Sequence, residues 1–277
     1  MVDSSLAGRT VLMTGGSRGI GLAIAVRAAR EGANIALVAK TDAPDPRLPG
    51  TIHTAAAAIE EAGGKALPIV GDIRDYDVVI RAAEATAARF GGIDIVVNNA
   101  SAIALTGFGE LSMKRYDLMQ DINARGTFAV TSAALPYLLE SRDPSILTLS
   151  PPLNLDRRWL AVHAPYTVSK YAMTMLTLGV AEQFRDQRIA ANCLWPRTLI
   201  ATAAVQNIVA GEKGMHSARR PEIMADAAAL ILTGHAPETT GQCYIDEDVL
   251  RASGITDLTP YLADGASEKD LEIDLFL

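Results

Sequence analysis

The clearest feature of this 277-residue sequence is a regular exchange between short apolar runs and longer segments with helical spacing. The runs suit strands buried on both faces, and the longer segments repeat apolar residues every three or four positions. Strands are predicted at residues 10–14, 34–39, 66–70, 93–97, 145–150, 189–195 and 242–245. Helices are predicted at 20–31, 51–62, 76–90, 111–139 (one helix or two), 164–184 and 221–232. Such alternation predicts an α/β fold, a Rossmann-type doubly wound parallel sheet of about seven strands with helices on both faces.

Two segments depart from this alternation. Thr41–Gly50 holds Pro44, Pro46 and Pro49 and follows the second strand, so it is either a ligand-binding loop at the carboxyl edge of the sheet or a plain surface loop. Residues 250–277 are more polar and form an arm that is either ordered or frayed. No linker divides the chain, so we predict a single domain over residues 1–277.

Composition narrows the possible partners. Hydrophobic residues make up 49% of the chain and the net charge is -7, without a Lys/Arg cluster, so a large core and no nucleic-acid partner are expected. No apolar stretch is long enough to cross a bilayer and no signal peptide is evident, so we expect no membrane partner and a cytoplasmic location. The scattered histidines, Cys193 and Cys243 match no metal or redox motif, which predicts no metal and two buried, reduced thiols.

A glycine-rich turn lies between the first strand and the first helix. Its sequence is Thr14-Gly15-Gly16-Ser17-Arg18-Gly19-Ile20-Gly21. Gly15 permits a tight turn, Gly19 permits close approach of a pyrophosphate, and Gly21 lets the helix pack on the sheet. The amides and dipole at the helix start would then hold phosphates. The G-x3-G-x-G spacing resembles the short-chain dehydrogenase/reductase superfamily, which implies a dinucleotide-binding and catalytic domain.

Charges near the end of the second strand bear on which dinucleotide is bound. An acidic residue there would favour NAD, but the chain has Lys40, and Arg18 lies within the glycine turn. Two cations favour a ribose 2′-phosphate, so NADP is predicted over NAD, the alternative being that both are solvated surface charges. The family resemblance also implies that Asp72-Ile73 contacts the adenine, although Asp72 could equally cap the next helix.

The central catalytic candidates are Tyr166 and Lys170, in a Tyr-x3-Lys pattern that opens a predicted helix. Residues four apart lie on one helix face, so the ammonium group is expected near the phenol. A nearby cation favours phenolate and would lower the pKa of Tyr166. The phenol would then give a proton to a carbonyl oxygen, or remove one from an alcohol.

The resemblance implies roles for other positions. Asn98-Asn99-Ala100-Ser101 resembles the family's Asn-Asn-Ala-Gly, and Asn123 matches the asparagine that supports a water relay to the lysine. The lysine also reaches the nicotinamide ribose in this family, and the backbone near Thr198 is expected to meet the carboxamide. The predicted cofactor contacts are Gly15, Ser17, Arg18, Gly19, Ile20, Gly21, Lys40, Asp72, Ile73, Asn99, Ala100, Tyr166, Lys170 and Thr198.

One expected group is out of place. The family places a serine hydroxyl near the carbonyl, but strand register puts Pro151 at that position and Ser150 one residue early. Alternate strand residues point to opposite faces, so Ser150 is either a catalytic hydroxyl re-aimed by the Pro-Pro step or a plain strand-end residue. Asn154 is another possible donor.

These departures together resemble the hydroxysteroid dehydrogenase-like protein 2 group. The resemblance rests on residues 39–41 and 48–52, 98–103, 150–155, 194–196 and 244–247, and it covers nearly the whole chain. Members of that group can carry a carboxyl-terminal sterol-carrier domain, and we expect none in these residues. The group is linked loosely to lipid metabolism, which does not establish activity on steroids.

The leading hypothesis is an NADP-dependent oxidoreductase for an apolar, lipid-like carbonyl or alcohol. Candidate lid residues are Trp159, Leu160, Trp195, Leu199 and Ile200, which are equally ordinary packing residues. The alternative is an NADP-binding sensor or scaffold with little turnover, which the proline at the serine position favours. A sugar-nucleotide epimerase would need a larger substrate domain. The long apolar helices at 111–139 and 164–184 predict a homodimer or homotetramer.

Overall fold

The computed structural model describes residues 5–45, 49–234 and 239–277. Its centre is one sheet in which every pair of neighbouring strands is parallel, in the order β3-β2-β1-β4-β5-β6-β7. The strands are β1 (Thr10–Thr14), β2 (Asn34–Ala39), β3 (Lys65–Val70), β4 (Ile95–Asn98), β5 (Ser145–Thr148), β6 (Ala190–Trp195) and β7 (Cys243–Ile245). The predicted seven-stranded doubly wound fold is confirmed.

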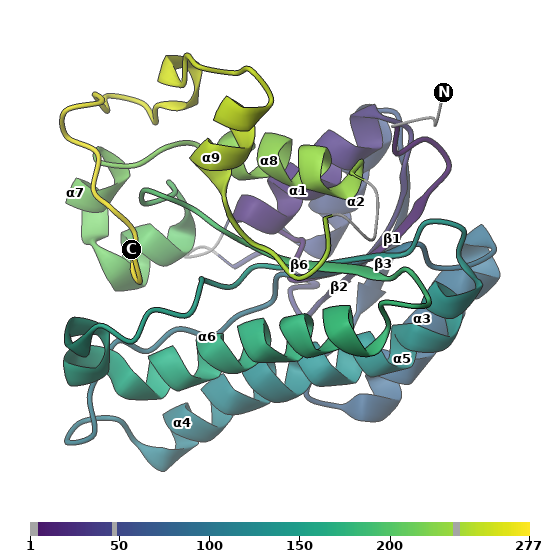
Figure 1. Cartoon of the computed structure of the whole chain (residues 1–277), viewed down its shortest axis with the longest axis horizontal. Helices are drawn as coiled ribbons and strands as arrows, with labels where there is room; N and C mark the ends of the chain where they lie inside the picture. The colour runs from purple at the N-terminus through teal and green to yellow at the C-terminus, as the bar shows by residue number, and fades with distance from the viewer. Residues whose placement is uncertain (1–4, 46–48, 235–238) are drawn as a thin grey trace.

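Helices cover both faces of this sheet (Figure 1). One face carries α1 (Gly19–Arg30), α2 (Ile52–Glu61), α8 (Glu222–Leu232) and α9 (Asp246–Ala252). The other carries α3 (Tyr76–Phe90), α5 (Gly126–Glu140) and α6 (Arg157–Gln183). Alternate strand residues serve the two layers: Val11 and Met13 join one apolar cluster, and Leu12 joins the other.

The helix boundaries differ from the sequence prediction in two places. The segment predicted at 111–139 is α4 (Met113–Gln120) and α5 joined by a π-helical turn, η1 (Asp121–Arg125). The helix predicted from residue 164 already starts at Arg157, with a kink at His163 (φ -142°, ψ 44°). Pro165 explains the kink, because proline lacks an N–H donor and its ring crowds the preceding turn. The short helices η2 (Val205–Val209), α7 (Gly211–Met215), α9 and η3 (Thr259–Tyr261) were not predicted.

The order of the sheet fixes where a ligand can bind. β1 lies between β2 and β4, so the chain leaves β1 and β4 in opposite directions and opens a crevice at their carboxyl ends. The glycine-rich turn follows β1 and Asn98-Asn99 closes β4, so both lie at this crevice. None of the helices in the described ranges is both long and apolar enough to span a membrane.

The two irregular segments have defined places. In the proline loop, Thr41 accepts a hydrogen bond from the Ile52 amide at 2.9 Å, whereas Pro46 lies outside the described residues. The arm at 250–277 continues past α9 and ends near the start of α6 (Figure 1). Ile273 forms an antiparallel bridge with Thr198, so this arm is ordered and rests against the segment after β6.

Candidate active site

The glycine-rich turn is shaped by close backbone packing. Gly15 (φ 70°) and Gly19 (φ 57°) adopt the left-handed conformation that favours glycine. A Cβ on Gly15 would lie 2.8 Å from the Ala100 Cα. α1 starts at Gly19 without any side-chain cap on its amides from the described residues, whereas α2 is capped by Thr51. Free amides at a helix start that glycines leave open are suited to a pyrophosphate.

Arg18 and Lys40 lie beside this turn, with their charges partly engaged. Arg18 donates to the carbonyl oxygens of Pro49 (3.1 Å) and Gly50 (2.9 Å), and so ties the proline loop to the turn. The Lys40 ammonium is 3.5 Å from an Asp72 carboxylate oxygen, and its side chain is 55% exposed. Arg18 is therefore bound to the proline loop, and Lys40 stays partly exposed beside Asp72.

Asp72 is part of an ion cluster. Arg74 donates to its carboxylate at 2.6 Å, and hydrogen bonds from Arg74, with the charge of Lys40, lower the pKa of Asp72 to about 2. Asp72 does not cap α3, because Asp75 accepts the first amides of that helix. Ile73 is buried against the apolar cluster under α3 and α5.

Tyr166 and Lys170 are buried side chains on α6. Tyr166 is 3% exposed, and its hydroxyl has no hydrogen-bond partner among the described residues although it borders a cavity. Lys170 is 2% exposed and donates to the Leu149 carbonyl oxygen, at the end of β5, at 2.6 Å. Its ammonium also lies 5.0 Å from the centre of the Trp195 ring.

The protonation of this pair differs from the sequence prediction. Burial and the charge of Asp274 raise the pKa of Tyr166, where a lowered pKa was expected. Burial also lowers the pKa of Lys170 to about 7, against smaller opposing effects of Cys193 and Asp274. The reason is desolvation: both groups lie in a dry interior that disfavours their charged forms.

Asn123 is fully buried in the π-helical turn. Its carboxamide accepts from the Ala102 amide (2.8 Å) and donates to the Ala102 carbonyl (3.0 Å) and the Ser169 hydroxyl (2.9 Å). Ser169 in turn donates to the carbonyl oxygen of Tyr166 at 2.8 Å. Asn123 therefore holds the backbone around Tyr166, and it forms no hydrogen bond with Lys170. Asn123 is the buried residue of this π-turn, and such turns occur often at functional sites.

Neither candidate for the missing hydroxyl borders the cavity beside Tyr166. Ser150 is fully buried and does not border that cavity. Its hydroxyl lies close to the Cys193 thiol but has no partner of hydrogen-bond geometry among the described residues. Asn154 donates to the Phe276 carbonyl oxygen at 2.8 Å. Ser150 therefore lies buried just after β5, and a catalytic role for it stays a prediction. Cys193 is buried and Cys243 only partly, and both are free thiols.

The cavity beside Tyr166 has a volume of about 110 Å³ and joins the glycine-rich turn to the arm. Ile20, the second residue of α1, borders it together with Tyr166, Thr202 and Asp274. Of the predicted lid residues, Trp195, Leu199 and Ile200 border it, whereas Trp159 packs against Phe276 and Leu160 is exposed. Thr198 is buried next to it.

Two functional candidates were missed from the sequence, Asp274 and Phe276. Both belong to the arm that was predicted only as polar. The signal was the apolar Leu275-Phe276-Leu277 run that follows Asp274, since apolar residues at the end of a polar segment indicate a docked strand.

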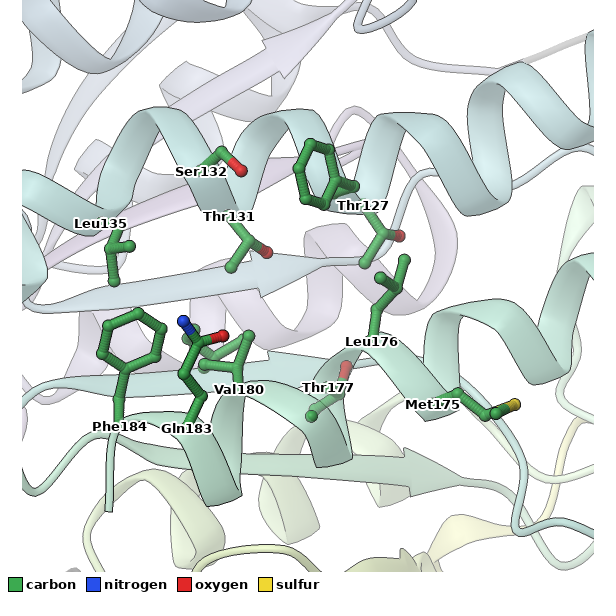
Figure 2. A pocket seen from close by; sticks show the side chains of 13 residues that line it. Thr127, Thr131, Ser132, Leu135, Met175, Leu176, Thr177, Val180, Gln183 and Phe184 are labelled. Carbon is green, nitrogen blue, oxygen red and sulfur yellow. The ribbon is translucent and has the colours of Figure 1, made fainter. Parts of the chain in front are cut away.

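A larger cavity of about 350 Å³ contains none of the predicted site residues. It is a groove between α5 and α6, and Figure 2 shows Thr131, Ser132 and Leu135 facing Val180, Gln183 and Phe184 across it. Phe128 (60% exposed) and Met175 (63% exposed) also border it, and no charged side chain does. This groove is uncharged, it mixes apolar side chains with Thr, Ser and Gln, and it does not include Tyr166. Among the described residues, no group of His, Cys, Asp or Glu could hold a metal ion.

Comparison with known proteins agrees with this arrangement. The model of the short chain dehydrogenase family matches residues 9–213. The chain therefore belongs to the short-chain dehydrogenase family, as the glycine-rich turn and the fold predicted.

Within that family the chain is similar to the predicted group. It is 53% identical over 256 residues to hydroxysteroid dehydrogenase-like protein 2 of Danio rerio, and 49% identical over 258 residues to that of Homo sapiens. These matches cover 92% of this chain but 61% and 60% of the relatives, so the chain spans about three fifths of their length.

Solved structures match the whole chain. A putative dehydrogenase from Xanthomonas campestris has a TM-score of 0.94 at 52% identity, covering 99% of both chains. A short chain dehydrogenase from Mycobacterium thermoresistibile has a TM-score of 0.92 at 53% identity, covering 99% of this chain and 96% of the other.

Proposed function

We propose that this protein transfers a hydride between NADP and the carbonyl or alcohol carbon of a small apolar substrate, with Tyr166 as the acid–base residue. The observation that carries the proposal is the cavity that Ile20 and Tyr166 share. It connects the start of α1, where a dinucleotide phosphate fits, to a phenol hydroxyl that has no hydrogen-bond partner among the described residues.

Each residue has one task in this proposal. The cofactor, when bound, supplies or accepts the hydride. The amides of the glycine-rich turn and α1 would hold its pyrophosphate. Tyr166 gives its proton to the carbonyl oxygen during reduction and takes a proton from the alcohol during oxidation. Lys170, fixed to Leu149, would contact the nicotinamide ribose when the cofactor is bound, and Asn123 and Ser169 hold the backbone that carries Tyr166.

The preference for NADP rests on charge at the end of β2. Lys40 is more than half exposed there and Arg18 is anchored close by, so a dianionic 2′-phosphate would meet cations. Asp72 opposes this with one negative charge, but Arg74 already pairs with it. No carboxylate ends β2 itself, where the hydroxyls of an NAD ribose would find their acceptor.

The proposed substrate is small and apolar. Most of the residues that border the cavity are apolar, and 110 Å³ is well below the ~300 Å³ or more of typical ligand sites. A larger, lipid-like substrate would therefore need the arm to move. This is the reason for testing short and long carbonyl compounds separately.

We also propose that the protein is a homodimer or homotetramer assembled through the α5–α6 groove of Figure 2. Phe128 and Met175 leave a large apolar area exposed on adjacent helices. Exposed apolar patches without charges mark association surfaces, and a symmetric contact would let the same patch cover itself. The size of the assembly in solution, measured for wild type and Met175→Glu, tests this proposal; wild type that remains a monomer would contradict it.

The experiment that tests the proposed function measures oxidation of NADPH and of NADH over aldehydes and ketones of increasing chain length. Turnover with NADPH on at least one short apolar carbonyl is expected. Tight NADPH binding without turnover on any of them would instead favour a cofactor-binding sensor or scaffold. The small cavity is the specific observation that favours that alternative.

A further inference from the structure

The end of the arm is built into the wall of the site. The Trp195 indole N–H donates to the Leu275 carbonyl oxygen at 2.8 Å, and the Asp274 amide donates to the Arg197 carbonyl oxygen at 3.0 Å. Phe276 is fully buried, with its ring centre 6.0 Å from that of Tyr166 and 5.4 Å from that of Tyr171. Residues 273–277 are therefore fixed from both sides.

This anchoring places Asp274 in the wall of the cavity that Tyr166 also borders. The charge of Asp274 raises the pKa values of both Tyr166 and Lys170. One oxygen, Oδ1, accepts from the Leu275 amide at 2.6 Å. The other, Oδ2, has no hydrogen-bond partner and no cation within ion-pair distance among the described residues.

A reaction at Tyr166 needs a second polar group. When a hydride reaches a carbonyl carbon, negative charge builds on the oxygen, and a preorganised donor there lowers the barrier. Ser150 lies outside the cavity, and the Asn154 amide is bonded to Phe276. Among the residues that border the cavity, Asp274 has a carboxylate oxygen without a hydrogen-bond partner in the described residues. Its charge also acts on the pKa of Tyr166.

We propose that Asp274, as a neutral carboxylic acid, donates the second hydrogen bond to the substrate carbonyl oxygen, opposite Tyr166. This inference rests on the proposed function. During reduction, the carbonyl carbon accepts the hydride, the oxygen takes the proton of the Tyr166 hydroxyl, and the C=O π pair becomes the new O–H bond. Asp274 keeps its own proton throughout, so its part is a hydrogen bond and not a proton transfer.

The surroundings of Asp274 support the neutral form. Burial raises the pKa of Asp274 to about 7, against the hydrogen bond from the Leu275 amide, which lowers it. The carboxylates of Asp246 on α9 and Glu272 on the arm also raise it, and Lys170 on α6 lowers it. Tyr166, also on α6, is uncharged near neutral pH because its own pKa is raised. Below about pH 7 the carboxyl can donate; above it the carboxylate repels the charge that develops on the substrate oxygen.

The test compares Asp274→Asn and Asp274→Ala with Asp270→Asn, an exposed acid on the same arm that bonds only Ser267. For carbonyl reduction between pH 5.5 and 8.5, wild-type kcat/KM should fall as pH rises through about 7. Asp274→Asn keeps an amide donor, so it should lose that fall and stay within about tenfold of wild type at pH 6. Asp274→Ala should lose about tenfold or more in kcat with unchanged NADPH affinity, and Asp270→Asn should match wild type.

A second readout does not depend on turnover. The infrared band of a protonated carboxylic acid at pH 6 should be weaker in Asp274→Asn than in wild type, and the difference should vanish by pH 8.5. Wild-type kcat and pH dependence in Asp274→Ala, or an unchanged band in Asp274→Asn, would overturn the inference while the proposed function stands. A wild type that reduces no carbonyl would overturn both.

Discussion

The side-chain amide of Asn99 donates a hydrogen bond to the carbonyl oxygen of Gly15 at 2.9 Å, and another to Thr14 at 3.1 Å. This pair joins the end of β4 to the turn that follows β1, at the point where the two strands diverge. The Thr14 hydroxyl oxygen also accepts hydrogen bonds from the backbone amides of Asn99 and Ala100. The shape of the phosphate-binding turn is therefore set by a neighbouring strand as well as by its own glycines.

Gly21 should not tolerate a side chain. A Cβ there would lie 2.4 Å from the Asn99 amide nitrogen and 2.9 Å from the Gly15 carbonyl oxygen. Gly21→Ala is therefore expected to lose about 1–3 kcal/mol of unfolding free energy and to weaken cofactor binding, because α1 must shift. Denaturant unfolding and cofactor titration measure both. Gly92→Ala is the matched control, since nothing lies within 4 Å of its Cβ; equal behaviour of the two variants would contradict the account of Asn99.

Lys40→Asp should shift the cofactor preference towards NAD. It removes the exposed cation at the end of β2 and places a carboxylate next to Asp72. A charge-assisted hydrogen bond contributes about 1.5–3 kcal/mol, so the ratio of NADP to NAD affinity should fall about tenfold or more. Lys65→Asp is the control variant. It makes the same charge change at the amino end of β3, away from the carboxyl ends of the strands where Lys40 lies. An NADP/NAD ratio unchanged in Lys40→Asp would refute the role given to Lys40.

Asp246 should make the fold less stable as pH rises. Burial raises its pKa to about 7, and its Oδ2 atom has no hydrogen-bond partner among the described residues. The unfolded chain releases this proton near the ordinary pKa of 3.8, so wild-type stability should decline between about pH 4 and pH 7. Asp246→Asn removes this titration while its side-chain oxygen still accepts from the Arg197 and Glu247 amides. Urea unfolding of both proteins across that range measures the effect; parallel pH profiles would show that Asp246 is already ionised at low pH.

Ser150→Ala should leave turnover unchanged. The hydroxyl is buried, lies outside the cavity of Tyr166, and has no partner of hydrogen-bond geometry among the described residues. Replacing such a group with an apolar one is neutral or stabilising, so the unfolding free energy should change by less than about 1 kcal/mol. Asn154→Ala is the contrasting variant, because it releases Phe276 from the site. A large loss of kcat in Ser150→Ala alone would restore Ser150 as the catalytic hydroxyl.

The strand and helix pattern could be predicted from the sequence because each element has a local cause. Apolar runs such as Asn34–Ala39 are long enough for a buried strand, and Gly91 (φ 93°) ends α3. The early start of α6 has a local cause that the sequence analysis missed, since Asp156 caps the helix and accepts from the Arg158 amide. The π-turn at Asp121–Arg125 had no such local signal, because its N-cap residue makes no side-chain capping bond.

The functional site could be predicted from the sequence only where its residues belong to one element. Tyr166, Lys170 and the glycine-rich turn follow from spacing within one element. The lowered pKa expected for Tyr166 did not follow, because desolvation depends on what surrounds the phenol in space. Phe276, more than a hundred residues further along the chain, is a large part of that surrounding. Long-range contacts of this kind also explain why Asp274 escaped the sequence analysis.

The central claim, that Tyr166 transfers the proton, is tested most directly by Tyr166→Phe. The ring and its packing against Phe276 remain, and only the hydroxyl is lost. Single-turnover reduction of a short carbonyl by bound NADPH should slow by about 10²-fold or more, with NADPH affinity within about twofold of wild type. A variant that binds NADPH and transfers hydride at the wild-type rate would contradict the account.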